Sequence, residues 1–179
     1  MKITGVAVKV GDHINTDLII SGKYKYRTQI ISELAKYVFE DLDPKLKDRL
    51  SVGSIIVAGK NFGCGSSREQ APRVLKAAGV RAILAESFAR IFFRNSVNVG
   101  LPTVVASQGF LREINDGDVL TVDLVLGKLY DETIERHSEV KPYPSFMLEI
   151  VKEGGIVEYY RKQGVFPWDK GTDCHSESL

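Results

Sequence analysis

The chain has 179 residues, the length of one domain, and can bury about two-thirds of the surface that its unfolded form exposes. Lys and Arg total 24 against 23 for Asp and Glu, so the formal net charge is +1. A chain this close to neutral has no overall field to attract nucleic acid or an anionic membrane, and recognition must be local. The first residues carry no charged leader followed by an apolar run, and no apolar stretch reaches the roughly 18 residues of a membrane span, which predicts a cytoplasmic protein.

The first third of the chain predicts one strand and one helix. Residues 5–10 have a strand pattern, and after a polar turn a short apolar segment continues at residues 18–20. Over residues 31–39 the apolar side chains recur at helical spacing, with Ser32 or Thr28 available as the cap. We therefore expect a strand, a polar turn with a short apolar continuation, and a helix, in that order.

The middle of the chain alternates between strand and helix patterns. Continuous apolar runs suited to buried strands occur at residues 53–58, 80–85 and 101–106. Between them lie apolar stripes at helical spacing, which stop at Gly79 and Gly100 as helices commonly do at glycine. Strand, helix and strand at this spacing imply right-handed crossovers and parallel pairing, so we predict a βαβαβ core.

The starts of the two core helices depend on single residues. Pro72 either kinks a first helix that begins at Ser66 or occupies the first position of one that begins later, and the sequence leaves both open. For the second helix, Ser87 stands where a cap is expected.

The last third mixes strands and helices. Residues 119–126 and 129–134 predict two antiparallel strands joined by a turn at Gly127-Lys128. Residues 146–151 predict a helix that stops near Gly154-Gly155, and a second short helix follows it.

The final residues, 165–179, show no periodicity that indicates an element. We predict one domain over residues 1–164 and a poorly ordered tail after it. In that tail Cys174 and His175 lack further metal ligands nearby. Two cysteines in the whole chain are too few for an iron–sulfur cluster or a structural zinc, so no metal site is predicted.

The most informative stretch is Asn61-Phe62-Gly63-Cys64-Gly65-Ser66-Ser67-Arg68-Glu69. Gly63 and Gly65 can adopt positive φ and bring backbone N–H groups close to a ligand. A helix that begins near Ser66 would direct its N–H groups and positive dipole end to the same point, and Arg68 adds a planar fork suited to a carboxylate. The stretch predicts an anion-binding site that holds a candidate proton acceptor.

Parts of this stretch also have a purely structural interpretation. Ser66 and Glu69 have the spacing of a capping box, which needs no function. Cys64 beside a helix start could be a nucleophile or a small packed loop residue, and no histidine is near it in sequence. A capping box does not account for the glycines on either side of Cys64 or for Arg68, and the combination favours the anion site.

Three segments, residues 11–17, 58–71 and 87–95, resemble the small, swivelling subunit of the 3-isopropylmalate dehydratase and homoaconitase family, related to the mobile C-terminal domain of aconitase. The resemblance implies an α/β fold, an aconitase-type swivelling β/β/α domain with the βαβαβ core and antiparallel additions. It further implies a hydro-lyase of leucine biosynthesis, active only in a heterodimer or heterotetramer with a large catalytic subunit. That large subunit carries a [4Fe-4S] cluster, and the small subunit binds none of its own.

The resemblance assigns roles within the loop. Family members dehydrate a 2-hydroxy di- or tricarboxylate and rehydrate it with the hydroxyl on the neighbouring carbon. By position, Ser66 matches the catalytic base that removes the substrate C–H proton. Ser67 and Arg68 match ligands of the substrate carboxylate, with supporting roles for Gly63, Cys64 and Gly65. A serine hydroxyl is a poor base at neutral pH, so it needs strong local positive potential.

Arg27 lies in the segment that varies with substrate in this family. A guanidinium there would match the distal carboxylate of a tricarboxylate, whereas an isopropyl group needs an apolar wall. Tyr24 and Tyr26 could equally form that wall while Arg27 points to solvent. Asp17 either orients the serine or neutralises an arginine, or it only closes an Asx turn after Asn15.

On the second core helix, Arg90 and Arg94 could reach the site or the partner subunit, or could be solvated or paired with acidic neighbours. Phe88 and residues 91–93 predict core and subunit-contact surface. Two classes of function remain. One is the substrate-closing half of a two-subunit hydro-lyase, and the other is a non-catalytic regulatory module that keeps only the anion loop.

Overall fold

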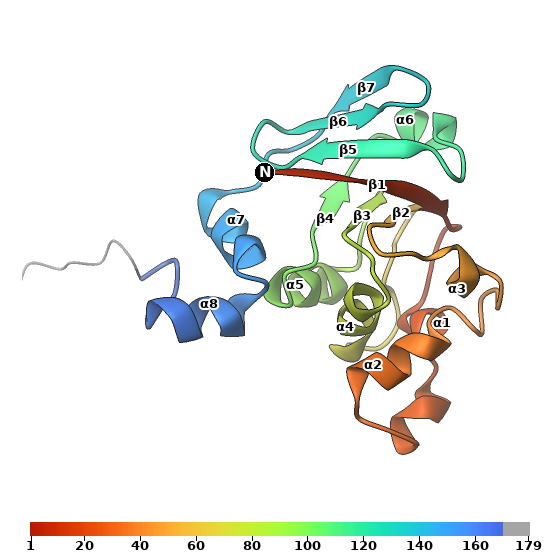
Figure 1. The fold of residues 1–179 in the computed structure, drawn as a ribbon, viewed down its shortest axis with the longest axis vertical. Helices are drawn as coiled ribbons and strands as arrows, with labels where there is room; N and C mark the ends of the chain where they lie inside the picture. The colour runs from red at the N-terminus through yellow and green to blue at the C-terminus, as the bar shows by residue number, and fades with distance from the viewer. Residues whose placement is uncertain (170–179) are drawn as a thin grey trace, which may run out of the picture.

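In the computed structural model, which describes residues 1–169 apart from the side chains of Lys25 and Tyr26, the strands form one mixed sheet. Among the described residues the sheet has seven strands in the order β4-β3-β2-β1-β5-β6-β7 (Figure 1). They are β1 (Lys2–Lys9), β2 (Ile55–Ala58), β3 (Ala82–Ala85), β4 (Thr103–Val105), β5 (Val119–Asp123), β6 (Lys128–Asp131) and β7 (Arg136–Glu139). Strand β1 pairs parallel with β2 and antiparallel with β5, so it joins a parallel half of the sheet to an antiparallel half.

The parallel half confirms the predicted βαβαβ core. Within the described residues the helices are α1 (Thr16–Ile19), α2 (Ile31–Leu34), α3 (Leu46–Arg49), α4 (Gln70–Ala77), α5 (Arg90–Asn98), α6 (Gln108–Glu113), α7 (Ser145–Lys152) and α8 (Ile156–Gln163), with 3₁₀ helices η1 (Gly22–Tyr26) and η2 (Ala35–Tyr37). Helix α4 connects β2 to β3, α5 connects β3 to β4, and both strand pairs are parallel. Each helix is followed by a glycine with positive φ, Gly79 at 96° and Gly100 at 70°.

Both faces of this parallel half are buried. Along β2, Ile55 and Val57 enter an apolar cluster that continues into β5, β6 and α7. Ile56 and Ala58 point the other way, into a second cluster formed with residues of α1, α2 and α4. A strand covered on both sides needs apolar side chains at every position, which is why residues 53–58 read as a continuous run.

The antiparallel half contains the predicted pair β5 and β6, and Gly127 turns the chain between them with a φ of 66°. Strand β7 extends this half beyond the sequence prediction and pairs with β6. It consists of Arg136-His137-Ser138-Glu139, which are mostly exposed and carry no alternating apolar pattern. Figure 1 shows β5, β6 and β7 stacked on the far side of β1 from the α4 and α5 helices.

The N-terminal third departs from the prediction at its apolar piece. Residues 16–19 form helix α1, which the sequence did not predict, and the side chain of Asn15 caps it by accepting a hydrogen bond from the Asp17 N–H at 2.9 Å. The helix predicted over residues 31–39 exists as α2 followed directly by η2. Neither Ser32 nor Thr28 caps α2. The cap position is Ile30, and Thr28 Oγ1 accepts from the Ile30 N–H at 3.1 Å, before the helix begins.

The C-terminal third matches the predicted helices. Helix α7 ends before Gly154 and Gly155, and a side chain at Gly155 would approach the Asn98 carbonyl oxygen to 2.7 Å. After α8, the Phe166 ring packs 4.7 Å from that of Tyr160. The rest of the predicted tail, with Cys174 and His175, lies outside the described residues. Along residues 1–169 no helix has the length and apolar character that crossing a membrane requires.

A buried carboxylate at the end of β6 gives a stability prediction. Asp131 is 1% exposed, and one of its oxygens accepts from the Thr133 N–H at 3.0 Å while the other has no hydrogen-bond partner among the described residues. Burial raises the pKa of Asp131, and nearby Asp118 raises it further. The unfolded chain releases this proton at lower pH than the folded one, so stability falls as pH rises through that window. We expect Asp131→Asn to increase the free energy of unfolding at pH 7 by about 1 kcal/mol.

Asp123 provides the matched control for Asp131. Its carboxylate closes the same kind of turn, but its pKa is lowered where that of Asp131 is raised. Burial works to raise its pKa, but the N–H groups of Leu126 and Val125 and the N-terminal ammonium outweigh burial and lower it. Asp123→Asn should therefore destabilise the protein at pH 7. Urea unfolding of both variants at pH 4.5 and 7.5 measures this, and a stability loss at pH 7 in Asp131→Asn would contradict the argument.

Candidate active site

The loop after β2 is fastened to the segment that follows β1. The Lys60 N–H donates to Asp12 Oδ1 at 2.7 Å, and the Gly63 N–H donates to the Ile14 carbonyl at 2.8 Å. Further along, the Thr16 N–H donates to the Cys64 carbonyl at 2.8 Å. The two segments thus run side by side at the carboxyl ends of β1 and β2, the edge of a parallel sheet where ligands usually bind.

The two glycines of the loop have positive φ, as predicted, at 78° for Gly63 and 91° for Gly65. The structural reason differs from the expected one. A Cβ at Gly63 would overlap the ring of Phe92, and one at Gly65 would overlap the side-chain amide of Asn15. These glycines let the loop pack closely on its own protein, and this packing fixes the position of the residues that follow.

Ser66 is exposed, and its hydroxyl makes no hydrogen bond to another of the residues 1–169. Its carbonyl is held by the Thr16 hydroxyl at 3.0 Å and by the Arg68 N–H at 2.8 Å. The backbone N–H groups of Gly65, Ser66 and Ser67 donate to no acceptor in the same part of the chain. Three successive free N–H groups beside an exposed hydroxyl suit an anion.

The helix expected to begin at Ser66 begins later. Helix α4 starts at Gln70, with Glu69 at the cap position and no side-chain cap. The capping-box interpretation is wrong: the Glu69 carboxylate instead pairs with Arg73, one turn on, at 2.9 Å. Pro72 lies in the first turn of α4, where it interrupts no helical hydrogen bond. The dipole end of α4 is therefore four residues away from Ser66, and the free loop amides are the nearer source of positive potential.

Arg68 is held from two sides. One guanidinium nitrogen donates to the Ile20 carbonyl at 2.8 Å, and another forms an ion pair with Asp17. With Ser67 it lines a cavity of about 250 Å³ whose other walls are Ile20, Ser21, Gly22, Leu34, Glu69 and Gln70. A guanidinium has five N–H donors in a fixed plane, so this anchoring leaves donors for a ligand in the cavity.

Asp17 thus contacts an arginine, one of the alternatives that its sequence position left open, while Asn15 forms the predicted Asx turn to the Asp17 N–H. Sequence reasoning missed Thr16, which is 2% exposed and holds the Ser66 carbonyl. Thr16 belongs to the motif of residues 11–17. The two residues are 50 positions apart in the chain, so no local pattern indicated that Thr16 contacts Ser66.

Arg27 is exposed at the end of η1, and its guanidinium carbon lies 5.5 Å from the centre of the Tyr24 ring. Tyr24 is 3% exposed and stacks on Tyr37 with ring centres 4.1 Å apart, so it belongs to the core. The segment after Arg27 reaches the start of α4, where the side chains of Gln29 and Gln70 are hydrogen-bonded at 3.2 Å. Ser21 and Gly22, at the start of the same segment, line the Arg68 cavity, whereas Arg27 is not among its lining residues. The side chain of Tyr26 lies outside the described part.

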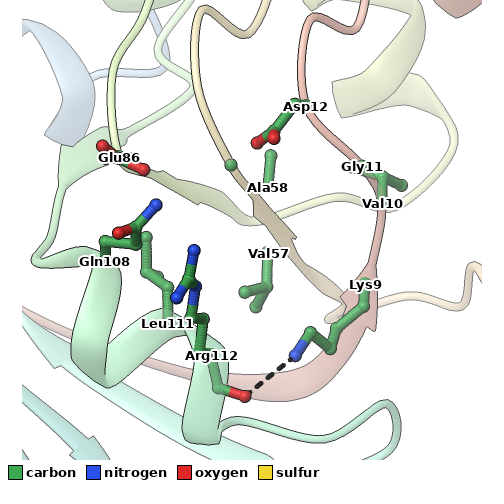
Figure 2. Close-up of a pocket in the computed structure, with 11 residues that line it drawn as sticks. Lys9, Val10, Gly11, Asp12, Val57, Ala58, Glu86, Gln108, Leu111 and Arg112 are labelled. Carbon is green, nitrogen blue, oxygen red and sulfur yellow. Dashed lines mark hydrogen bonds between the residues drawn. The ribbon is translucent and has the colours of Figure 1, made fainter.

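A second cavity, of about 210 Å³, lies at the base of the same loop and is shown in Figure 2. Glu86, Gln108 and Arg112 extend into it from one side and Asp12 from the other. The Lys9 ammonium group donates to the Arg112 carbonyl at 3.4 Å. Its lining carries both signs of charge, with Lys9 and Arg112 against Asp12 and Glu86, and includes neither Ser66 nor Arg68.

Cys64 is half-buried, and its Sγ lies 3.5 Å from the His13 carbonyl, a packed position in the loop. Along residues 1–169 no group of three or more His, Cys, Asp or Glu side chains is placed to hold a metal ion. The polar groups assembled at this edge are a hydroxyl, backbone amides and a guanidinium, which is an arrangement for a carboxylate ligand.

Comparison with known proteins agrees with this fold. The aconitase C-terminal domain family matches residues 15–109. A 3-isopropylmalate dehydratase small subunit of Archaeoglobus fulgidus is 50% identical over 92% of this chain and 98% of its own. The methanogen homoaconitase small subunit of Methanothermobacter thermautotrophicus is 47% identical over 89% of this chain and 91% of its own. The crystal structure of a 3-isopropylmalate dehydratase from Methanocaldococcus jannaschii superposes with a TM-score of 0.84 at 40% identity, covering 96% of this chain and all of that one.

The fold and the matched residues define an α/β domain of the aconitase C-terminal class, as predicted. Within that class, the chain belongs to the family of 3-isopropylmalate dehydratase and homoaconitase small subunits.

Proposed function

We propose that this chain is the small subunit of a hydro-lyase that interconverts 3-isopropylmalate and 2-isopropylmalate by dehydration and rehydration, a step of leucine biosynthesis. The names of its relatives support this reaction. The observation that carries the proposal is the exposed Ser66 hydroxyl, which belongs to the same loop as the free backbone N–H groups of residues 65–67 and the anchored Arg68. This set of groups suits an enzyme that binds a carboxylate and takes a proton from the carbon next to it.

In this proposal Ser66 accepts the substrate C–H proton, while Ser67 and the remaining N–H donors of Arg68 bind a substrate carboxylate. An alkoxide at Ser66 requires positive potential, which the amides of residues 65–67 supply. The Arg68 charge contributes less, because Asp17 is paired with it. A [4Fe-4S] cluster on the partner supplies the Lewis acid for the leaving hydroxyl. The residues described here provide base and binding groups, and the partner completes the site.

The partner is a large catalytic subunit, in a heterodimer or a heterotetramer. Ser66 and Ser67 lie at the protein surface, so a substrate bound to them alone would stay in contact with water. A second protein surface over the loop would exclude that water and strengthen each of these electrostatic contacts. Gly63, Cys64 and Gly65 hold the loop in place for this closure.

Anaerobic reconstitution with the cluster-loaded large subunit tests the proposal. We expect neither subunit alone to turn over 3-isopropylmalate, homoaconitate or dimethylmalate, and the mixture to convert 3-isopropylmalate. A non-catalytic regulatory module would behave differently, because the large subunit would then be active alone and this chain would only change its rate. Full activity of the large subunit by itself would therefore refute the proposal.

A homoaconitase-type activity is the second candidate, and Arg27 favours it. The guanidinium is exposed, no ion-pair partner for it exists in the described residues, and its segment borders the Arg68 cavity. A guanidinium in that place could bind the distal carboxylate of a tricarboxylate, which an isopropyl group lacks. The homoaconitase small subunit among the relatives supports the same substrate class.

Arg27→Val should change the ratio of substrates. We expect kcat/KM for homoaconitate to fall about 10–100-fold more than kcat/KM for isopropylmalate, the range of one charge-assisted hydrogen bond. Lys23→Met is the control, because its ammonium also lies over the Tyr24 ring, at 5.0 Å, but is paired with Asp41 at 2.7 Å. Equal losses on both substrates in Arg27→Val would end the idea that this residue discriminates between them.

A further inference from the structure

An apolar cavity of about 330 Å³ opens at the start of α5. Half-buried Phe88 and Phe93 form its floor with ring centres 6.1 Å apart. Val105, which is 50% exposed, stands at its edge, and Ile91 on the same helix is 52% exposed. We call these residues, with Arg90 and Arg94, the α5 surface. The exposed Ile91 and Val105 and the half-buried Phe88 and Phe93 come from α5, the residue stretch before it and β4. Grouped apolar side chains at the surface mark an interaction site more often than scattered ones do.

Two unpaired cations border this cavity. Arg90 and Arg94 are exposed, both line it, and neither has a hydrogen bond or ion pair with any of residues 1–169. The acidic residue of the lining, Glu86, has a partner already, since Lys60 Nζ lies 3.6 Å from its carboxylate. The α5 surface therefore offers apolar contact together with positive charge, and its complement is an apolar projection flanked by carboxylates.

The α5 surface is continuous with the Ser66 loop. The Phe62 N–H donates to the Ser87 carbonyl at 2.9 Å, and the Ala89 N–H donates to the Phe62 carbonyl at 2.9 Å. The Phe62 ring also packs against Phe88, with ring centres 6.1 Å apart. Only three residues lie between Phe62 and Ser66, so we expect a body that closes over the serine to reach the cavity beside Phe88 as well.

We propose that the large subunit docks on the α5 surface, placing an apolar side chain in the cavity and acidic side chains against Arg90 and Arg94. The inference rests on the proposed function, which requires a partner over the Ser66 loop. It makes α5 a docking element that fixes the partner without taking part in the chemistry. Apolar anchors in a pocket with charges at the rim are the usual composition of such a contact.

The double variant Arg90→Glu and Arg94→Glu tests this in the reconstituted enzyme. We expect the Kd for the large subunit to rise at least about tenfold in low salt, with kcat at saturating partner within about twofold of wild type. The matched control reverses two exposed cations on α7 and α8, Lys152→Glu and Arg161→Glu, and should leave the Kd unchanged. Ile91→Ser tests the apolar part without a charge change, and it should also raise the Kd.

Each outcome bears on the docking surface. A Kd for the double variant equal to that of the wild type and the control overturns it. Loss of self-association in the double variant with an unchanged Kd for the large subunit also overturns it, since a second copy would then be the occupant. A wild-type complex that forms without turnover would refute the proposed chemistry, while weaker binding of the double variant would still support the docking surface.

Discussion

Replacing Ser66 with alanine is expected to lower kcat of the reconstituted enzyme by about 10²–10⁴-fold, the usual contribution of a positioned general base. The Kd for the large subunit should not change. The structure explains why kcat should fall while the Kd stays the same. The Ser66 hydroxyl is exposed and hydrogen-bonded to none of residues 1–169, whereas backbone groups hold the loop in place. Alanine keeps those backbone contacts and removes one oxygen atom. Steady-state kinetics and a binding titration on the same preparation measure both effects.

A proton-exchange experiment can distinguish whether Ser66 acts as a base or only binds the substrate. The wild-type enzyme in D₂O should exchange the substrate C–H for deuterium, and Ser66→Ala should lose this exchange together with turnover. Ser67→Ala is the neighbouring control, which should raise KM with a smaller effect on kcat, since its hydroxyl is proposed only to bind a carboxylate. If Ser66→Ala kept more than a tenth of the wild-type kcat, another group would have to be the base.

The structure also changes the physical account of how the serine could ionise. The sequence suggested the dipole of a helix that starts at Ser66, but α4 starts at Gln70. What lies beside the hydroxyl instead is a run of backbone N–H groups without acceptors in the described chain, from Gly65 to Ser67. Amides held by a rigid loop need no reorganisation when a negative charge forms, which is the requirement for stabilising an alkoxide.

The core of the fold could be predicted from sequence because its signals are local. A strand covered on both faces needs an uninterrupted apolar run, and residues 53–58 supplied one for β2. A helix that is followed by a residue with positive φ favours glycine there, and Gly79 and Gly100 marked the C-terminal ends of α4 and α5. The elements that the sequence did not predict, α1, α3, α6 and β7, are all short. A side-chain cap marks the start of α1 and of α6, from Asn15 and Ser107, and pairing with β6 forms β7. Neither kind of contact leaves a periodic pattern.

The candidate site was predictable only in part for the same reason. The glycines, serines and arginine of one loop form a motif that can be recognised in sequence. The contacts that position them join residues far apart in the chain: Thr16 to Ser66, Asp17 to Arg68, and Gly63 to the ring of Phe92. These contacts form only when β1, β2 and α5 pack together, so no window of sequence contains both partners.

Arg68→Lys is expected to lower kcat/KM by about 100-fold, mainly through a higher KM, while the stability of the protein changes little. Arg68 donates to the Ile20 carbonyl at 2.8 Å and pairs with Asp17, and its remaining donors face the cavity that it lines with Ser67. A lysine has three donors on one atom and cannot hold a carbonyl, a carboxylate and a bound substrate in one plane. Losing a charge-assisted contact to substrate costs about 2–5 kcal/mol, a range that includes the energy of the roughly 100-fold fall in kcat/KM.

Arg73→Lys is the control for this argument, because it makes the same chemical change on α4, five residues after Arg68. Arg73 pairs with Glu69 at 2.9 Å between side chains that are both largely exposed, and such pairs contribute at most about 1 kcal/mol. Its kcat/KM should stay within about twofold of wild type. If both lysine variants lost activity equally, the loss would not depend on the planar fork at position 68. A loss confined to Arg68→Lys means that the planar fork, fixed by Ile20 and Asp17, holds the substrate carboxylate beside Ser66.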